Sequence, residues 1–203
     1  MIYTVTFNPA IDYVLKANSF EKNKINKSEN EKIFPGGKGI NVSIVLNNLG
    51  IESRALGFIA GFTGNKIEEM INKLGVKTEF INLKNGNSRI NIKIDSDNKE
   101  TAINCTGPKI EKEELRTLIE KLEMLKDDDI LVLAGSIPNG IENNIYEIIC
   151  ERLQNKKIKV IVDATSNLLT NVLKYRPYLI KPNDEELGEI FNVEIKDEKD
   201  AYI

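Results

Sequence analysis

The sequence predicts an α/β protein, in which helices cover a mainly parallel sheet and a second, smaller sheet lies beside it. In the second half of the chain, amphipathic helical segments alternate with short, continuously apolar strands. Strands joined by helical crossovers have to run parallel, so this half predicts a parallel sheet. Near the middle of the chain, a run that alternates strictly between apolar and polar residues predicts a separate, half-exposed strand pair.

The first half of the chain supplies two strands and one helix. Ile2 to Phe7 is a β-rich run that Asn8-Pro9 ends, and the next strand is amphipathic and carries Asp12 on its polar face. A charged segment from Glu21 to Lys32 then leads to a glycine-rich loop and a helix from about Ile40 to Leu49, with Gly50 as its C-terminal cap. Apolar residues cover most of this helix's circumference, which predicts a buried helix.

The second half repeats a strand and helix unit. We expect helices at about 114–125, 144–153 and 168–173, and strands at 130–134, 158–162 and 178–181. Four strand ends in the chain carry polar groups, at Asp12, Gly135-Ser136, Asp163 and Lys181-Pro182-Asn183. Ligands of open parallel sheets bind at the carboxyl ends of the strands, so these groups are candidates for a site.

The alternating segment differs from the rest. Ser88 to Ile94 places its isoleucines on one face and its polar residues on the other, and Asp95 to Asn98 supplies a turn before Glu100 to Asn104. Together with the strand around Asp12, this hairpin predicts a small sheet that covers the ligand edge as a lid, within about residues 12–34 and 88–104. The alternative is an ordinary solvated polar face.

Composition excludes several function classes. The 203 residues carry a net charge of −3 with the signs interspersed, so neither a nucleic-acid footprint nor a basic membrane patch is expected. No signal peptide or membrane span is apparent, which predicts a cytoplasmic protein with small-molecule ligands. The two cysteines lie far apart and are expected as thiols. With no histidine, any chemistry depends on carboxylates, lysine, arginine, backbone amides and a bound cation, the set that phosphoryl transfer needs.

The glycine-rich loop from Pro35 to Val42 indicates an anion site. Three glycines within four residues let the backbone approach a ligand closely, and the following helix start offers unpaired amides. The loop has neither the Gly-Lys-Ser/Thr of a P-loop nor the G-x-G-x-x-G of a dinucleotide fold. The phosphate held there therefore need not belong to a nucleotide. A tight turn that uses glycine for steric reasons alone is the alternative.

Four motifs in order resemble the PfkB group of ribokinase-like carbohydrate kinases, over essentially the whole chain. They are Asn8-Pro9-Ala10-Ile11-Asp12, Gly36-Gly37-Lys38-Gly39-Ile40-Asn41, Gly135-Ser136-Ile137-Pro138 and Lys181-Pro182-Asn183-Asp184-Glu185-Glu186. The resemblance implies a ribokinase-like three-layer sandwich. Within the group, Ser88 to Ile94 and Glu100 to Asn104 are most similar to the 1-phosphofructokinase subgroup, although Ala102 stands where that subgroup has a glutamate. Tagatose-6-phosphate kinase and the minor 6-phosphofructokinase share the other motifs.

The resemblance assigns the substrate-binding residues. It implies that Asp12 binds the sugar hydroxyls and that Ser136 contacts the substrate. It also implies that Gly37, Gly39 and Asn41 orient the sugar. Lys38 and Arg89 would neutralise the phosphate already on the substrate. Each has an ordinary alternative. An aspartate or serine near a turn caps the turn, and a lone cation lies on a solvated surface.

ATP and Mg²⁺ are the implied cofactors. The resemblance places Lys181, Asn183 and Glu186 near the nucleotide phosphates, with Glu186 at the magnesium ion, and Lys24 of the lid segment at a nucleotide phosphate, with Lys22 and Lys27 as rival registers. Asn183 and Glu186 also have the spacing of a helix N-cap and its N3 glutamate, which needs no ligand. Both roles are compatible, because a capped helix start pointing at a phosphate serves both.

The implied activity is ATP-dependent phosphorylation of fructose 1-phosphate to fructose 1,6-bisphosphate, in a homodimer that forms through the lid. Complete members of the group continue into a Gly-Ala-Gly-Asp segment that supplies the catalytic base, and we expect it beyond Ile203. The sequence as it stands therefore predicts a truncated domain with no measurable kinase activity. A phosphosugar-binding fragment without catalysis is the alternative of another class.

Overall fold

The computed structural model describes residues 1–97, 99–138, 140–164, 166–197 and 200. Asn98, part of the turn that the sequence predicts, lies outside the described residues. The strands are β1 (Ile2–Thr6), β2 (Ala10–Lys16), β3 (Asn30–Gly36), β4 (Ser53–Ile59), β5 (Lys77–Thr78), β6 (Ile81–Asn82), β7 (Arg89–Ser96), β8 (Lys99–Ile103), β9 (Ile130–Ala134), β10 (Lys159–Asp163) and β11 (Leu179–Ile180). The helices are α1 (Lys38–Asn48), α2 (Gly61–Lys73), α3 (Lys112–Glu123), α4 (Ile145–Leu153), α5 (Ser166–Val172) and α6 (Asp184–Phe191), with a 3₁₀ turn at Leu173–Tyr175.

Seven strands form the main sheet, in the order β11-β10-β9-β1-β4-β5, and β6 also pairs with β4. All of these pairings are parallel. The chain therefore crosses over the sheet between neighbouring strands. The apolar periodicity predicts the crossover helices α1, α3, α4 and α5, whereas it gives no assignment for α2. The predicted parallel sheet is confirmed, with element ends within a few residues of those expected.

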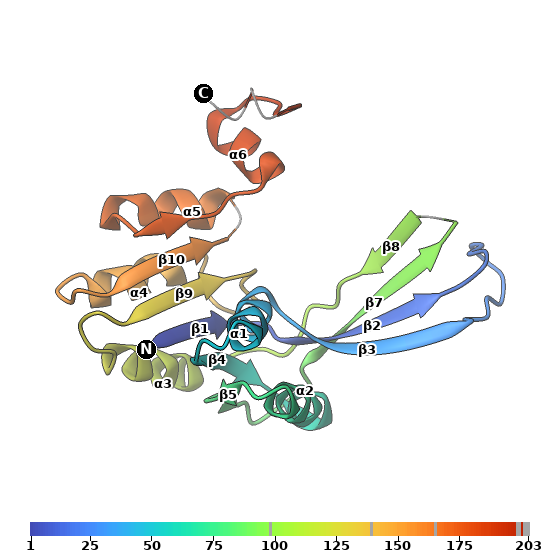
Figure 1. The fold of residues 1–203 in the computed structure, drawn as a ribbon, viewed down its shortest axis with the longest axis horizontal. Helices are drawn as coiled ribbons and strands as arrows, with labels where there is room; N and C mark the ends of the chain where they lie inside the picture. The colour runs from blue at the N-terminus through green and yellow to red at the C-terminus, as the bar shows by residue number, and fades with distance from the viewer. Residues whose placement is uncertain (98, 139, 165, 198–199, 201–203) are drawn as a thin grey trace.

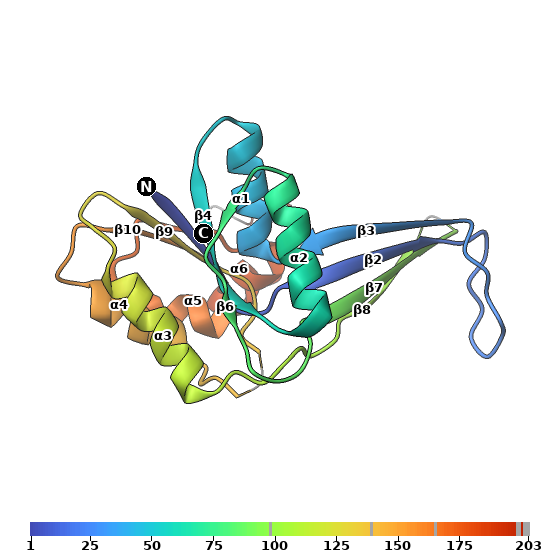
Figure 2. The same ribbon diagram turned by 90° about the horizontal axis from the view of Figure 1, so that it is seen from below.

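Helices cover both faces of this sheet (Figure 2). On one face, α3, α4 and α5 pack against the sheet in a large core that includes Leu56 and Phe58 of β4. On the other face, α1 and α2 pack against Ala55 of the same strand. Successive residues of a strand point to opposite faces, so β4 is buried on both sides, as parallel strands between helical layers are. The predicted three-layer sandwich is confirmed.

The glycine loop leads into α1, which is only partly buried. Its buried residues are Gly39, Ile40 and Ser43, whereas Val45 and Leu49 are 56% and 68% exposed. The expectation of a buried helix is wrong, because α1 lies in an outer layer and contacts the strands through one face only. Gly50 follows the C-cap residue with φ +76°, as the predicted capping glycine should.

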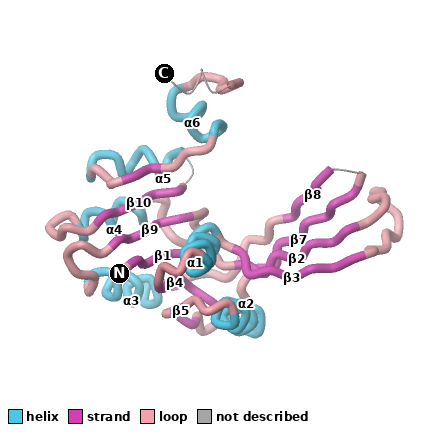
Figure 3. Tube along the Cα trace, viewed as in Figure 1, coloured by secondary structure: helices cyan, strands magenta, loops and turns pink. Residues whose placement is uncertain are grey.

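The second sheet is small and mixed, in the order β3-β2-β7-β8. β2 pairs antiparallel with β3 and parallel with β7, and β7 and β8 form the predicted hairpin. Figure 3 shows these four strands extending beyond the helical layers, from the edge where the main strands end. The small sheet is confirmed. Its strand β3 begins inside the charged segment, because pairing with β2 rather than local pattern defines it.

Among the described residues, no helix combines the length and the apolar character needed to cross a lipid bilayer.

Candidate functional site

The carboxyl ends of the main strands meet beside the start of α1 and the base of the second sheet (Figure 1). A pocket of roughly 230 Å³ lies there. Its lining comes from β1 and the loop after it, the glycine loop, the second sheet and the end of β9: Thr6, Asn8, Gly37, Lys38, Arg89, Asn104, Ala134, Gly135 and Ser136. Of the predicted substrate-binding residues, the fold thus brings Gly37, Lys38, Arg89 and Ser136 to one cavity.

The glycines let α1 start directly against β1. A Cβ on Gly39 would lie 2.6 Å from Thr6 Oγ1 and 2.7 Å from the Val5 carbonyl oxygen. Gly37 is the N-cap residue, with φ +129°, a conformation that side chains rarely adopt. Thr6 Oγ1 accepts a hydrogen bond of 3.0 Å from the Ile40 amide and so satisfies one of the free amides of the helix start. The steric interpretation of the glycines therefore holds, and it leaves the helix start facing the pocket.

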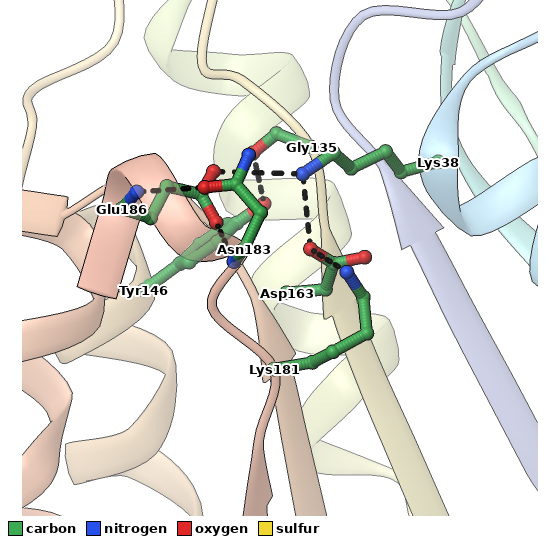
Figure 4. Close-up of polar contacts among 7 residues, drawn as sticks. All are labelled: Lys38, Gly135, Tyr146, Asp163, Lys181, Asn183 and Glu186. Carbon is green, nitrogen blue, oxygen red and sulfur yellow. Dashed lines mark hydrogen bonds and ion pairs between the residues drawn. The ribbon is translucent and has the colours of Figure 1, made fainter. Parts of the chain in front are cut away.

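Four charged side chains meet at the strand ends beyond this pocket, as Figure 4 shows. Lys38 Nζ donates to Asp163 Oδ1 at 2.9 Å and lies 3.8 Å from Glu186 Oε1. Lys181 Nζ lies 3.3 Å from the same Asp163 oxygen. Asp163 and Glu186 are both 8% exposed, so each carboxylate charge is partly desolvated and is balanced by the ammonium groups. These four residues form what we call the edge group.

Asn183 and Glu186 form a complete capping box at the start of α6. Asn183 Oδ1 accepts a hydrogen bond from the Glu186 amide at 2.6 Å, and Glu186 Oε2 accepts one from the Asn183 amide at 3.0 Å. The other carboxylate oxygen of Glu186 faces Lys38. The capping interpretation is confirmed, and the same side chain still reaches the edge group.

Asp12 is bound by two side chains of β7. Asn91 Nδ2 donates to Asp12 Oδ1 at 2.9 Å, and Lys93 Nζ lies 3.5 Å from Oδ2. The parallel register places Asp12 opposite Asn91 and Val14 opposite Lys93, so one face of the second sheet presents these polar groups. A Cβ on Gly36 would lie 2.7 Å from the Asp12 carboxylate, so this glycine leaves room for it.

Arg89 anchors the base of the second sheet. Its Nε donates to the Asn8 carbonyl oxygen at 3.1 Å, and its Nη1 contacts the Cys105 carbonyl oxygen at 3.5 Å. Burial lowers the pKa of this guanidinium, and the negative charge of Asp12 partly offsets the effect. A partly buried guanidinium that is bonded to neutral carbonyls retains its preference for an anion. Arg89, Lys93 and Asp12 form what we call the lid group.

Ser136 is exposed at the end of β9 and faces the pocket beside Gly135. The Gly135 carbonyl oxygen accepts a hydrogen bond of 3.1 Å from the hydroxyl of Tyr146 on α4. Tyr146 is fully buried, and burial followed by the nearby charge of Asp163 raises its pKa, so this phenol stays protonated and can donate. The hydrogen bond from buried Tyr146 thus stabilises the turn that carries Ser136.

Two predicted residues lie apart from the others. The loop between β2 and β3 lies at the far tip of the second sheet (Figure 2). Lys24 belongs to this loop, and its ammonium pairs with Glu21 at 2.6 Å. Its predicted contact with a nucleotide phosphate is not part of this arrangement. Asn41 lies on the exposed side of the first turn of α1 and is not among the described residues that line the pocket.

Sequence reasoning missed several residues that the fold brings to the site. Asp163 is not one of them, because the sequence already indicates it as a polar strand end, although it assigns no role to it. Asn91 and Lys93 share the polar face of Arg89, so a pattern existed for these two. Asn8 and Asn104 belong to the motifs that carry the resemblance, which assigns no role to them, and Thr6 carries no pattern. The packing of distant segments brings all three to the pocket.

The edge group has a donor set that suits magnesium bound together with phosphate. Among the described residues, no cluster of three or more acidic, histidine or cysteine side chains could form a metal cage. Mg²⁺ typically takes one or two carboxylates and completes its shell with water and phosphate oxygens. Asp163 and Glu186, which share the ammonium of Lys38, fit that requirement.

Known proteins resemble this chain over nearly its whole length. The family model described as pfkB family carbohydrate kinase matches residues 4–202. A 1-phosphofructokinase of Bacillus subtilis is 39% identical over 99% of this chain and 66% of its own length. A D-tagatose-1-phosphate kinase of Bacillus licheniformis is 37% identical over 95% of this chain and 62% of its own length.

The fold comparison agrees with the sequence comparison. Phosphofructokinase-2 of Escherichia coli, solved in complex with fructose-6-phosphate, superposes with a TM-score of 0.91 at 25% identity, over 99% of this chain and 67% of that one. The chain therefore spans about two thirds of the length of the proteins that it matches.

Proposed function

Because the chain belongs to the pfkB family of carbohydrate kinases, we propose that it forms the sugar-binding portion of an ATP-dependent kinase whose acceptor is a ketohexose phosphate. The first candidate substrate is fructose 1-phosphate, phosphorylated on its 6-hydroxyl to give fructose 1,6-bisphosphate. The name of the Bacillus subtilis relative supports this choice.

One observation carries the proposal. A single pocket lies between a partly buried arginine at the lid and a lysine at the strand ends, with Ser136 and the glycine loop on its walls. A sugar phosphate needs such a cavity, with cations for its phosphate and polar groups for its hydroxyls. Asp12 lies on the polar face of the second sheet and would accept hydrogen bonds from the hydroxyls.

The reaction requires in-line transfer of the terminal phosphoryl group of ATP. A bond forms between the acceptor hydroxyl oxygen and the γ-phosphorus, the bond to the β,γ-bridging oxygen breaks with its electron pair leaving on ADP, and the hydroxyl proton passes to a base. We expect that base, and amides that stabilise the transferred group, in the third of the relatives' length that this chain does not cover. Glu186 and Asp163 would hold magnesium, which neutralises phosphate charge when it is bound.

D-tagatose 1-phosphate is the second candidate substrate, and the name of the Bacillus licheniformis relative favours it. Tagatose 6-phosphate, the tagatose substrate that the sequence resemblance implies, stays a further candidate. Fructose 6-phosphate stays a third, since the Escherichia coli structure contains it. The second sheet is the proposed dimer interface, and a cytoplasmic location is part of the proposal.

Titration and turnover together test the proposal on this chain. Calorimetry should show binding of fructose 1-phosphate and much weaker binding of fructose, because only the phosphate engages the arginine. A coupled ADP-release assay should show no measurable turnover, since a general base contributes ~10²- to 10⁴-fold and one anion-stabilising donor ~10²- to 10³-fold. Equal affinity for fructose and fructose 1-phosphate would contradict the proposed substrate class, and normal turnover would show that the chain needs no further base.

A further inference from the structure

The charged side chains of the site form two groups rather than one. The lid group consists of Arg89, Lys93 and Asp12, and its contacts stay within the second sheet and the loops at its base. The edge group of Lys38, Asp163, Lys181 and Glu186 lies at the ends of the main strands. The pocket touches both groups, because Arg89 and Lys38 both line it.

Lys38 belongs to the edge group, although it starts from the glycine loop. Its side chain lines the pocket, while its ammonium binds Asp163 at 2.9 Å and lies 3.8 Å from Glu186. Glu186 also belongs to the capping box of α6, so this helix starts beside the same edge. The ammonium therefore lies where incoming polyphosphate would meet the chain.

A ketohexose phosphate has its phosphate at one end and its acceptor hydroxyl at the other. If the lid group holds the phosphate, the opposite end of the sugar points toward the edge group. The bond to the transferred phosphorus forms there, and negative charge on its oxygens needs a cation at that position.

Resting on the proposed function, we propose that Lys38 binds the phosphoryl group in transfer, whereas Arg89 binds the phosphate already on the sugar. Lys38 and Arg89 would therefore bind different phosphates, whereas the sequence resemblance assigns both residues to the phosphate already on the sugar. Asp163 positions Lys38: its carboxylate accepts the hydrogen bond of the ammonium at the strand ends until phosphate oxygens replace the carboxylate as the partner.

Calorimetry on this chain separates the two roles with two ligands. Fructose 1-phosphate represents the acceptor, and magnesium tripolyphosphate represents the nucleotide phosphates. The variants Lys38→Met and Arg89→Met keep the aliphatic stems, and Lys66→Met, an exposed lysine of α2 that pairs with Glu69, is the control. Lys38→Gln replaces Lys38→Met if the latter does not melt cooperatively.

We expect opposite responses. Arg89→Met should lower the affinity for fructose 1-phosphate at least about tenfold and leave the affinity for tripolyphosphate nearly unchanged, because it removes a charge-assisted contact to the first ligand only. Lys38→Met should lower the affinity for tripolyphosphate at least about tenfold and change the affinity for fructose 1-phosphate less than about threefold.

An equal loss of fructose 1-phosphate binding in both variants would overturn the separation of roles while leaving the proposed substrate class intact. Lys38-dependent tripolyphosphate binding without any sugar-phosphate binding would support the role of Lys38 and contradict the proposed substrate instead. A native chain that binds tripolyphosphate no better than Lys38→Met does would also overturn the inference.

Discussion

Single residues in this site serve two purposes, and their contacts show how. Glu186 accepts the amide of Asn183 with one carboxylate oxygen and faces Lys38 with the other. Thr6 caps α1 through its hydroxyl and also lines the pocket. Asn8 fixes Arg89 through its carbonyl oxygen, and its side-chain amide donates to the Thr106 carbonyl at 2.9 Å. Structural hydrogen bonds of this kind therefore fix the positions of the charged groups Glu186 and Arg89.

The two cysteines should differ in reactivity. Cys105 is exposed near the pocket, whereas Cys150 is buried, and burial followed by the charge of Glu147 raises its pKa from 9.0 to about 11. At pH 8, a thiol reagent should label Cys105 in the native state and Cys150 only in denaturant, because the thiolate is the reacting form.

The pH dependence follows from the same shift in pKa. Above about pH 9, the unfolded chain ionises Cys150 and the folded chain does not, so the free energy of unfolding should fall as the pH rises through that range. A Cys150→Ala variant should lose this part of the dependence, as measured by urea melts at pH 8 and pH 10. Labelling of both cysteines at equal rates in the native protein would contradict the burial of Cys150.

At the scale of elements, helix starts rather than whole helices carry residues of the candidate site. α1 begins at the pocket because glycines allow close contact with β1, and α6 begins at the edge group with its Glu186 amide capped by Asn183. Strand ends place Asp163 and Lys181 beside them. The parallel sheet thus collects three segments of the chain at one edge, at Lys38, at Asp163 and at Lys181 to Glu186.

Substitution of Glu186 by Gln separates its capping role from its charge. Glutamine keeps an oxygen that can accept from the Asn183 amide. The free energy of unfolding should therefore fall by only about 0.3–1 kcal/mol, the contribution of a charge at a helix N-terminus. Affinity for magnesium tripolyphosphate should fall ~10-fold or more, because a carboxylate that would hold the metal is lost.

Glu114→Gln provides the matched control for that experiment. Glu114 forms the same capping box with Glu111 at the start of α3, with an amide contact of 2.9 Å. It should show the same small loss of stability and no loss of tripolyphosphate affinity. If the two variants bind tripolyphosphate equally well, Glu186 is a cap and nothing more.

At the scale of the whole molecule, the second sheet has two different faces. Asp12, Asn91 and Lys93 lie on the face toward the site. On the other face, the strand register aligns an apolar row across all four strands, made of Ile33, Tyr13, Ile92 and Ile103. Ile33 and Ile103 are 49% and 51% exposed. An uncovered apolar row on a four-stranded sheet is typical of an interface.

We expect this chain to associate through that row. Sedimentation velocity over a concentration series should show a dimer, and Ile33→Lys should shift it to monomer, because burying an unpaired ammonium is costly. Phe34→Lys is the control, since Phe34 is equally exposed but points to the opposite face. A dimer that survives Ile33→Lys and is lost with Phe34→Lys would place the interface on the other face.

Local pattern predicted much of the fold, and the limits of the prediction have a physical cause. Strands such as Ile130–Ala134 and helices such as Ile145–Leu153 were predictable, because apolar periodicity reports burial directly. The pattern predicted too much burial for α1, and it gave no signal for β3, whose strand conformation depends on pairing with β2. The segment from β4 to β6 received no assignment from pattern.

The sequence by itself determined the order of elements, the glycine loop, the capping box and the set of charged residues available for phosphate. Tertiary structure decided which charges meet. The hydrogen bond from Lys38 to Asp163 spans 125 positions in the chain, and no local pattern reports a contact at that separation. For the same reason only the fold could place Lys24 at a distant tip and Lys38 at the strand ends, where the two lysines form different ion pairs.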